Sequence, residues 1–121
     1  MNKKHKGKWG EEKAAQYLLR KGLIIIDRNQ RTPYGELDII AQDREQIVFV
    51  EVKMRSTNFL GFPEDAVDYK KEQHLINSAE EYLTNHPNLG ENWRIDIITI
   101  EGNPQKPGVN IRWYKNAISS G

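Results

Sequence analysis

Residues 35–55, GELDIIAQDREQIVFVEVKMR, read as two strands joined by a tight polar turn. The second strand begins with the apolar run IVFV at 47–50, which is typical of a strand that is buried on both faces. Glu51 and Lys53 then stand where the same face should stay apolar. Because burying a charge without a partner is costly, charged residues at core positions indicate either a partner or a function.

The two strands are predicted to present their charges on one side of the sheet. Side chains alternate along a strand, so Glu51 and Lys53 share a face, and Glu36 and Asp38 share a face of the preceding strand. Either of two even-numbered turns keeps these four charges together, whereas a slip of one residue would separate them.

The position of the turn decides how close the two acids lie. A turn with residues 43–44 at its centre would place Asp38 opposite Phe49, diagonal to Glu51. A turn over residues 43–46 would place Asp38 directly opposite Glu51. The sequence leaves both registers open.

Two adjacent carboxylates need a positive charge between them. Unit charges ~4 Å apart repel by roughly 4 kcal/mol at an effective dielectric near 20. The chain has no cysteine, and its three histidines are scattered, so carboxylate oxygens would favour Mg²⁺ or Mn²⁺ over zinc. Such an ion can activate water and stabilise charge on an attacked phosphoryl group, which predicts metal-assisted hydrolysis of a phosphodiester. The alternative is a buried ion pair of Lys53 with Glu51 or with Asp38.

The spacing of apolar residues predicts two helices and three further strands around this pair. The first helix has Ala15, Leu18 and Leu19 on its buried face, and the second carries an apolar stripe between Leu75 and Leu83. The helices are predicted over residues 9–21 and 64–85, a loop over 56–63, and strands over 23–31, 36–41, 46–54, 93–100 and 108–114. This order predicts an α/β fold in which a mixed central β-sheet, with strand 46–54 at its centre, is flanked by α-helices.

Composition limits the class of protein. The 121 residues, of which 37% are hydrophobic and 29% charged, predict a single globular domain over 1–121. We expect a basic flexible tail at 1–8 and a flexible tail at 115–121. The net charge is only +1, and no apolar run reaches membrane-spanning length, so we expect a cytoplasmic protein that does not contact membranes.

The motifs GELD and VFVEVKMR resemble the PD-(D/E)XK nuclease superfamily, with Asp38 and Glu51-x-Lys53 as its core motif. More closely, the chain is similar to the YraN-like family of bacterial proteins, themselves similar to archaeal Holliday junction resolvases. The resemblance runs from Gly10 to about Ile100 and includes GEEKAAQYLLRKG, RNQRTPYGELDIIA, GFPEDAV and RIDIITI. It implies a restriction-endonuclease-like fold.

The resemblance also implies roles for individual residues. Asp38 and Glu51 would be metal ligands together with the backbone carbonyl of Val52, and Lys53 would be the catalytic lysine. Glu12 matches the helical acid that related resolvases place beside the metal. The alternative for Glu12 is a first-turn acid favoured by the helix dipole.

Four other residues are candidates with equally plain alternatives. Glu36 is either an additional metal ligand or an exposed residue at a strand end. Lys71 continues the buried stripe of the second helix, where it would contact phosphate, complete the site, or only extend its charge to solvent. Arg31 and Arg55 flank the strand ends, where they are candidates for binding the phosphates of nucleic acid.

The leading hypothesis is a metal-dependent nuclease that acts on DNA, with structured or branched DNA suggested by analogy to resolvases, which are dimers. The alternative is a nucleic-acid-binding module that keeps a nuclease fold without chemistry. A third class, a protein–protein adaptor, would leave the basic residues unexplained.

Overall fold

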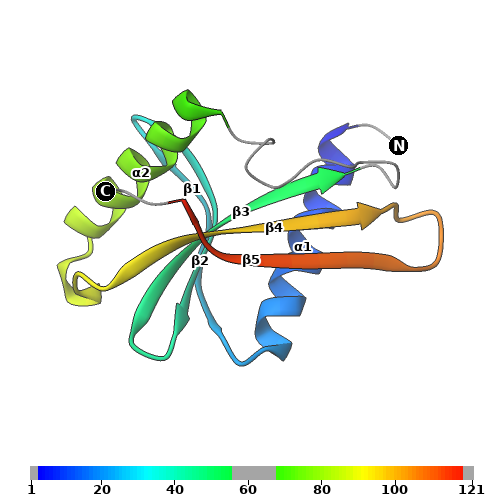
Figure 1. The fold of residues 1–121 in the computed structure, drawn as a ribbon, viewed down its shortest axis with the longest axis horizontal. Helices are drawn as coiled ribbons and strands as arrows, with labels where there is room; N and C mark the ends of the chain where they lie inside the picture. The colour runs from blue at the N-terminus through cyan, green and yellow to red at the C-terminus, as the bar shows by residue number, and fades with distance from the viewer. Residues whose placement is uncertain (1–2, 56–67, 119–121) are drawn as a thin grey trace.

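The computed structural model describes residues 3–55 and 68–118 of the chain. Within these ranges a five-stranded β-sheet carries one α-helix on each face (Figure 1). The elements follow in the order α1 (Lys3–Arg20), β1 (Ile24–Thr32), β2 (Gly35–Asp43), β3 (Gln46–Arg55), α2 (Tyr69–Thr84), the 3₁₀ turn η2 (Pro87–Leu89), β4 (Trp93–Gly102) and β5 (Val109–Ile118). No helix in the described ranges is both long and apolar enough to cross a membrane.

The sheet is mixed, and β3 lies at its centre. The strand order is β1-β2-β3-β4-β5, with β3 and β4 parallel and the other neighbours antiparallel. A parallel pair needs a crossover, and the chain between β3 and β4 contains α2. The predicted α/β class, the mixed sheet with flanking helices and the central position of residues 46–54 are confirmed.

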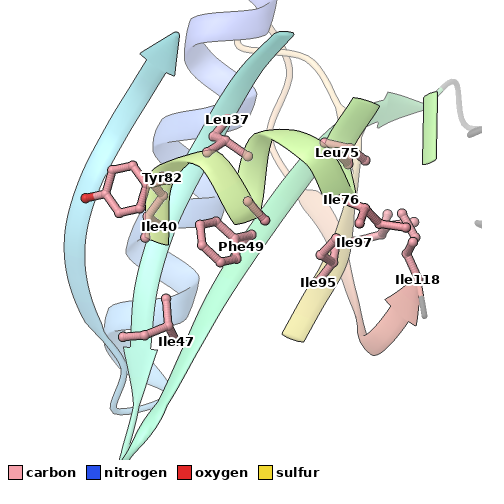
Figure 2. Packing of buried hydrophobic residues seen from close by; sticks show 11 residues of the cluster. Leu37, Ile40, Ile47, Phe49, Leu75, Ile76, Tyr82, Ile95, Ile97 and Ile118 are labelled. Atoms are coloured by element: carbon pink, nitrogen blue, oxygen red, sulfur yellow. The ribbon is translucent and has the colours of Figure 1, made fainter. Parts of the chain in front are cut away.

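Two apolar cores hold the helices to the sheet. Phe49 on β3 packs with Leu75, Ala79 and Tyr82 of α2, as Figure 2 shows for part of this cluster. The core on the opposite face is built from the intervening residues of the same strands and from α1. It contains Ala14, Ala15, Leu18, Leu23, Ile39, Ala41, Val48, Val50, Ile98 and Ile100.

The β2–β3 hairpin takes the register of the turn over residues 43–46. Asp43 pairs with Gln46 and the pairing continues to Ile39 with Val50. Between the strands Arg44 has a positive φ of 58°, a conformation that tight hairpin turns require. The pairing, if extended by one step, places Asp38 opposite Glu51.

Near both ends of the described residues, regular elements extend further than the sequence predicts. Helix α1 begins at Lys3 and β5 continues to Ile118, so residues 3–8 and 115–118 belong to regular elements and not to flexible tails. The lysine-rich first turns of α1 have no apolar periodicity, which explains why the pattern predicts a later start.

The second helix also starts later than predicted. Asp68 has an extended backbone and accepts a hydrogen bond from the Lys71 N–H, so it is the N-cap and α2 begins at Tyr69. The predicted loop at 56–63, and the predicted helical residues 64–67, lie outside the described residues.

Candidate functional site

The site forms where β2 and β3 stop pairing. The last paired residues are Ile39 and Val50, and Figure 2 shows the two strands diverging from their hairpin. Beyond this point the Asp38 side chain takes the place of a backbone carbonyl of β2 as hydrogen-bond acceptor, because its Oδ2 accepts the Val52 N–H at 2.9 Å. The N–H and C=O of a strand residue face the same neighbour, so the Val52 carbonyl faces the same side.

Glu51 is a buried carboxylate between two lysines. The residue is only 5% exposed, and its Oε1 lies 3.4 Å from Lys53 Nζ and 3.7 Å from Lys71 Nζ. Its other oxygen, Oε2, is buried and has no hydrogen-bond partner within the described ranges. A buried carboxylate oxygen without a donor is costly, so this atom is an unused acceptor inside the site.

Asp38 has a strongly perturbed acidity. Burial, followed by the charge of Glu51, raises the pKa of Asp38 from 3.8 to about 7, and the charge of Glu11 acts in the same direction. The hydrogen bond from Val52 and the charge of Lys71 oppose this rise in the pKa. Asp38 is thus a buried carboxyl group whose ionisation a neighbouring carboxylate disfavours, which is a frequent property of functional sites.

The acid of α1 whose charge acts on Asp38 is Glu11, whereas the resemblance to resolvases points to Glu12. The Glu11 side chain is 13% exposed, and its Oε1 accepts hydrogen bonds from Asn29 Nδ2 at 2.9 Å and from Arg28 Nε and Nη2, both at 3.3 Å. Glu12 is 52% exposed and binds Arg28 Nη1 at 2.9 Å, and this contact lowers the pKa of Glu12. Glu12 therefore does not reach the Asp38–Glu51 pair.

The difference between Glu11 and Glu12 has a physical cause in the buried stripe of α1. The stripe contains Ala14, Ala15 and Leu18, whereas Leu19, which the prediction included, is 55% exposed. Glu11 precedes the three buried residues by three, four and seven positions, so it extends their stripe. Counting both alanines as core would have selected Glu11 from the sequence.

Glu36 is not brought to the site. It is exposed near the start of β2, opposite Arg31 of β1. Leu37 packs in the same core cluster as Ile40, three residues further on, so the alternation of side chains is broken around Asp38. This break separates Glu36 from the face on which it was predicted.

The three predicted phosphate-binding cations lie in different places. Lys71 is in the first turn of α2 and contacts Glu51, as a site-completing cation would. Arg31 is exposed near the end of β1. Arg55 is half-buried at the end of β3, where its Nη1 donates to the Met54 carbonyl at 3.1 Å.

The donor set fits a hard divalent cation. Among the described residues, no three acidic or histidine side chains converge into a metal site. Two carboxylates, Asp38 and Glu51, and the carbonyl of Val52 are nevertheless available, and Glu51 Oε2 has no hydrogen-bond partner in the described part of the chain. Mg²⁺ is commonly held by one or two carboxylates while it keeps several waters.

Comparison with known proteins places the chain in a family. The model of "Uncharacterised protein family UPF0102" matches residues 10–100. A UPF0102 protein of Persephonella marina is 43% identical over 113 residues, which cover 93% of this chain and 92% of the relative. A UPF0102 protein of Caldicellulosiruptor saccharolyticus is 38% identical over 98% of this chain and 100% of the relative.

Among solved structures, the chain is similar to SfsA of Pyrococcus furiosus in complex with Ca²⁺, with a TM-score of 0.40 and 18% identity. The match covers 93% of this chain and 63% of that one. The family is decided by the sequence matches, and the chain belongs to Uncharacterised protein family UPF0102.

Proposed function

We propose that this protein is a metal-dependent endonuclease that hydrolyses phosphodiester bonds of DNA. The observation that carries the proposal is the environment of Glu51. Its carboxylate is buried beside the high-pKa Asp38, receives two lysines on one oxygen, and keeps the other oxygen free of hydrogen bonds in the described ranges. Carboxylates and lysines so arranged suit a reaction in which negative charge develops on phosphate.

Each residue has a role in this proposal. Asp38, Glu51 and the Val52 carbonyl would hold Mg²⁺ or Mn²⁺, which when bound supplies Lewis-acid stabilisation of the phosphate. Lys53, 25% exposed and 3.4 Å from Glu51, would orient the attacking water and stabilise the developing charge. Lys71 is 41% exposed, so its ammonium can also reach a phosphate at the mouth of the site.

The wider proposal concerns the substrate and the assembly. Arg31 and Arg55, at strand ends, would bind backbone phosphates on either side of the cleaved bond. The likeness of the Asp38 and Glu51-x-Lys53 motif to the PD-(D/E)XK superfamily supports a restriction-endonuclease-like site, and the likeness to resolvases supports branched DNA as substrate. Cleavage of two strands would require two copies of the chain, so we propose a homodimer on the substrate.

One observation favours a non-catalytic nucleic-acid-binding module as the second candidate. Glu51 Oε1 is already close to both Lys53 and Lys71, so the charge of this buried acid is compensated without metal. In that case the lysines would hold Glu51 in place, and DNA would bind at Arg31 and Arg55 without being cut.

A cleavage assay separates the two candidates. Purified protein is incubated with labelled linear duplex, single-stranded, flapped and four-way-junction DNA, in Mn²⁺, in Mg²⁺ or in chelator. The nuclease cuts at least one substrate, only with metal, and Lys53→Met abolishes the cutting. Lys70→Met is the matched control, because Lys70 is an exposed neighbour of Lys71 on α2. Binding of all four DNAs without any cutting would support the binding module instead.

A further inference from the structure

A second polar pocket lies at the end of the molecule opposite Glu51. It has a volume of about 630 Å³ and is formed where the end of α1, the β2–β3 hairpin and the strands β4 and β5 meet. The hairpin and the end of α1 lie together in the lower part of Figure 1. The pocket is lined by Lys21, Gly22, Leu23, Asp43, Arg44, Gln46, Arg94, Trp113 and Lys115.

Three exposed cations converge on this pocket without acidic partners. In the described part of the chain, no carboxylate lies within 4 Å of the charged groups of Lys21, Arg44 or Lys115. Two of them lie over aromatic rings instead, Lys115 Nζ 4.4 Å from the centre of the Trp113 ring and Lys21 Nζ 5.2 Å from that of Tyr17. Asp43, the acidic residue of the lining, is paired with Arg94, so the three cations still repel each other and a bound anion would relieve this repulsion.

The floor of the pocket is a buried polar network that the proposed reaction does not use. Asp96 is completely buried and accepts hydrogen bonds from Arg94 Nε at 2.9 Å, Trp113 Nε1 at 2.8 Å and the Asn116 N–H at 2.8 Å. Arg94 is 11% exposed and also reaches Asp43 Oδ2 at 3.1 Å. Asp96 and Arg94 each make several hydrogen bonds, so the network holds the pocket walls in one arrangement.

The backbone N–H groups at the end of α1 are already used. Those of Lys21, Gly22 and Leu23 donate to carbonyls in the last turn of α1. The charged donors that remain at the pocket are the ammonium groups of Lys21 and Lys115 and the guanidinium of Arg44. Point charges around an open polar pocket suit phosphate, whereas an apolar ligand would find few apolar walls.

We propose that this pocket binds a phosphate group, supplied either by the backbone of nucleic acid or by a free nucleotide. The nucleic-acid source rests on the proposed function. Gln46 of the pocket and Glu51 of the candidate site are five residues apart on β3, which corresponds to ~17 Å at about 3.3 Å per residue. Phosphates repeat every ~3.4 Å along one strand of DNA, so a strand would need about five nucleotides to reach from one site to the other.

The test compares two triple variants with equal loss of charge, in chelator so that no cleavage occurs. The pocket variant is Lys21→Gln/Arg44→Gln/Lys115→Gln, and the control is Lys70→Gln/Lys106→Gln/Arg112→Gln, all exposed residues. Inorganic phosphate, adenosine monophosphate and a 20-base-pair duplex are titrated into each protein. The indole N–H signal of Trp113 reports on the pocket by nuclear magnetic resonance, while Trp9 and Trp93 serve as internal references.

We expect phosphate to shift the Trp113 signal in the wild type and in the control, and the pocket variant to lose at least tenfold in phosphate affinity. If nucleic acid is the source, duplex affinity also falls in the pocket variant, and the salt slope decreases by about 0.9 for each lost contact. Phosphate and nucleotide binding with unchanged duplex affinity assigns the pocket to a free nucleotide.

Two results would overturn the proposal. One is an absence of any shift of Trp113 with phosphate, nucleotide or duplex. The other is an equal loss of affinity in both triple variants, which would attribute binding to overall charge. Because all titrations are binding measurements without metal, they stand whether or not the protein cleaves DNA. The single variant Lys115→Gln repeats the comparison with the least change to the fold.

Discussion

At the scale of single residues, the contacts of Glu51 are not those of an ion pair optimised for stability. Both lysines approach the same oxygen, at 3.4 and 3.7 Å, while the buried second oxygen lacks a donor in the described ranges. A stabilising buried ion pair would satisfy all of its lone pairs, because an unsatisfied buried acceptor costs about 1–3 kcal/mol. The arrangement is better explained by a ligand that completes it.

The first prediction concerns Glu51 and Lys53 directly. Glu51→Gln and Lys53→Met should each reduce metal-dependent cleavage by about a hundredfold or more, the usual effect of removing an electrostatic stabiliser. Far-ultraviolet circular dichroism should stay native, because Lys53 and Lys71 are partly exposed and remain hydrated when their acid is lost. Rates are measured on the best substrate of the cleavage assay. Near-wild-type cleavage by either variant would remove these residues from the site.

The second prediction follows from the raised pKa of Asp38. Because the pKa is about 7 in the folded protein and 3.8 in the reference state, the folded protein binds this proton more tightly than the unfolded chain. Ionised Asp38 therefore destabilises the fold, slightly near pH 4 and fully above pH 7, so stability falls as the pH rises.

Asp38→Asn removes this charge and keeps an oxygen for the Val52 N–H. In chelator at pH 8, the variant should have a free energy of unfolding a few kcal/mol larger than that of the wild type and therefore a higher melting temperature. This difference in stability should shrink toward pH 4. Thermal melts at four pH values measure the difference. A variant that melts lower at every pH would show that Asp38 is half of a stabilising ion pair.

The sequence predicts the types of residue in the candidate site better than it predicts their exact positions. Asp38, Glu51 and Lys53 could be located because they interrupt an apolar strand pattern, and Lys71 because it continues an apolar stripe. Glu11 is separated from Glu12 only when Ala14 is counted in the buried stripe and Leu19 is left out, because a helical stripe displaced by one residue fits the same sequence almost equally well. The side chains of β2 stop alternating between the two faces of the sheet near Asp38, where the Asp38 side chain binds the Val52 N–H. The spacing of apolar residues in the sequence does not reveal this hydrogen bond.

At the scale of elements, the position of α1 depends on one close contact with β3. Gly10 is buried, and a Cβ at this residue would collide with Met54 Sδ. Glycine therefore lets the helix backbone approach the strand, and the charge of the next residue, Glu11, acts on Asp38. The contact also explains a glycine inside a helix, where it otherwise costs about 1 kcal/mol relative to alanine.

The third prediction tests this contact with a double-mutant cycle. Gly10→Ala alone should destabilise the protein by about 1–3 kcal/mol, because either Met54 or the helix must move. In the background of Met54→Ala, the same substitution should be neutral or stabilise by up to about 1 kcal/mol, the helix propensity of alanine. Urea unfolding measures all four proteins. Equal effects in both backgrounds would contradict the role given to Met54.

The sequence predicts a helix or strand well where that element buries a regular pattern of apolar side chains. The strands and the central position of β3 follow from runs such as 47–50, which only a doubly covered strand can bury. The sequence leaves two hairpin registers open. The choice between them depends on the backbone conformation of the turn, where Arg44 has a positive φ, and the sequence does not reveal this conformation. The start of α1 was missed because its lysine-rich turns carry no apolar stripe.

At the scale of the whole molecule, four elements contribute charged side chains that act on the candidate site. Asp38 comes from β2, Glu51 and Lys53 from β3, Lys71 from α2, and α1 adds the field of a further acid, Glu11. The charges of Glu51 and Glu11 both raise the pKa of Asp38, and among the described residues two lysines contact Glu51. The folded state without metal therefore stores repulsion that unfolding would release, as sites built for function commonly do.

The last prediction is that metal reverses this destabilisation. A ligand that binds only the native state stabilises it by mass action, by about 2.7 kcal/mol at a hundred times its Kd. Millimolar Mn²⁺ or Mg²⁺ should therefore raise the wild-type melting temperature by several degrees at pH 8. Asp38→Asn lacks one ligand and should respond little.

The control for ionic strength is an equivalent concentration of NaCl, because screening alone also weakens repulsion among carboxylates. An equal rise with Mn²⁺ in wild type and variant would assign the effect to carboxylates elsewhere on the surface. No rise in the wild type would leave Glu51 with Lys53 and Lys71 as its only partners, and would favour the binding module over the nuclease. Because the melts need no substrate, they test the metal site before any DNA is found that the protein cuts.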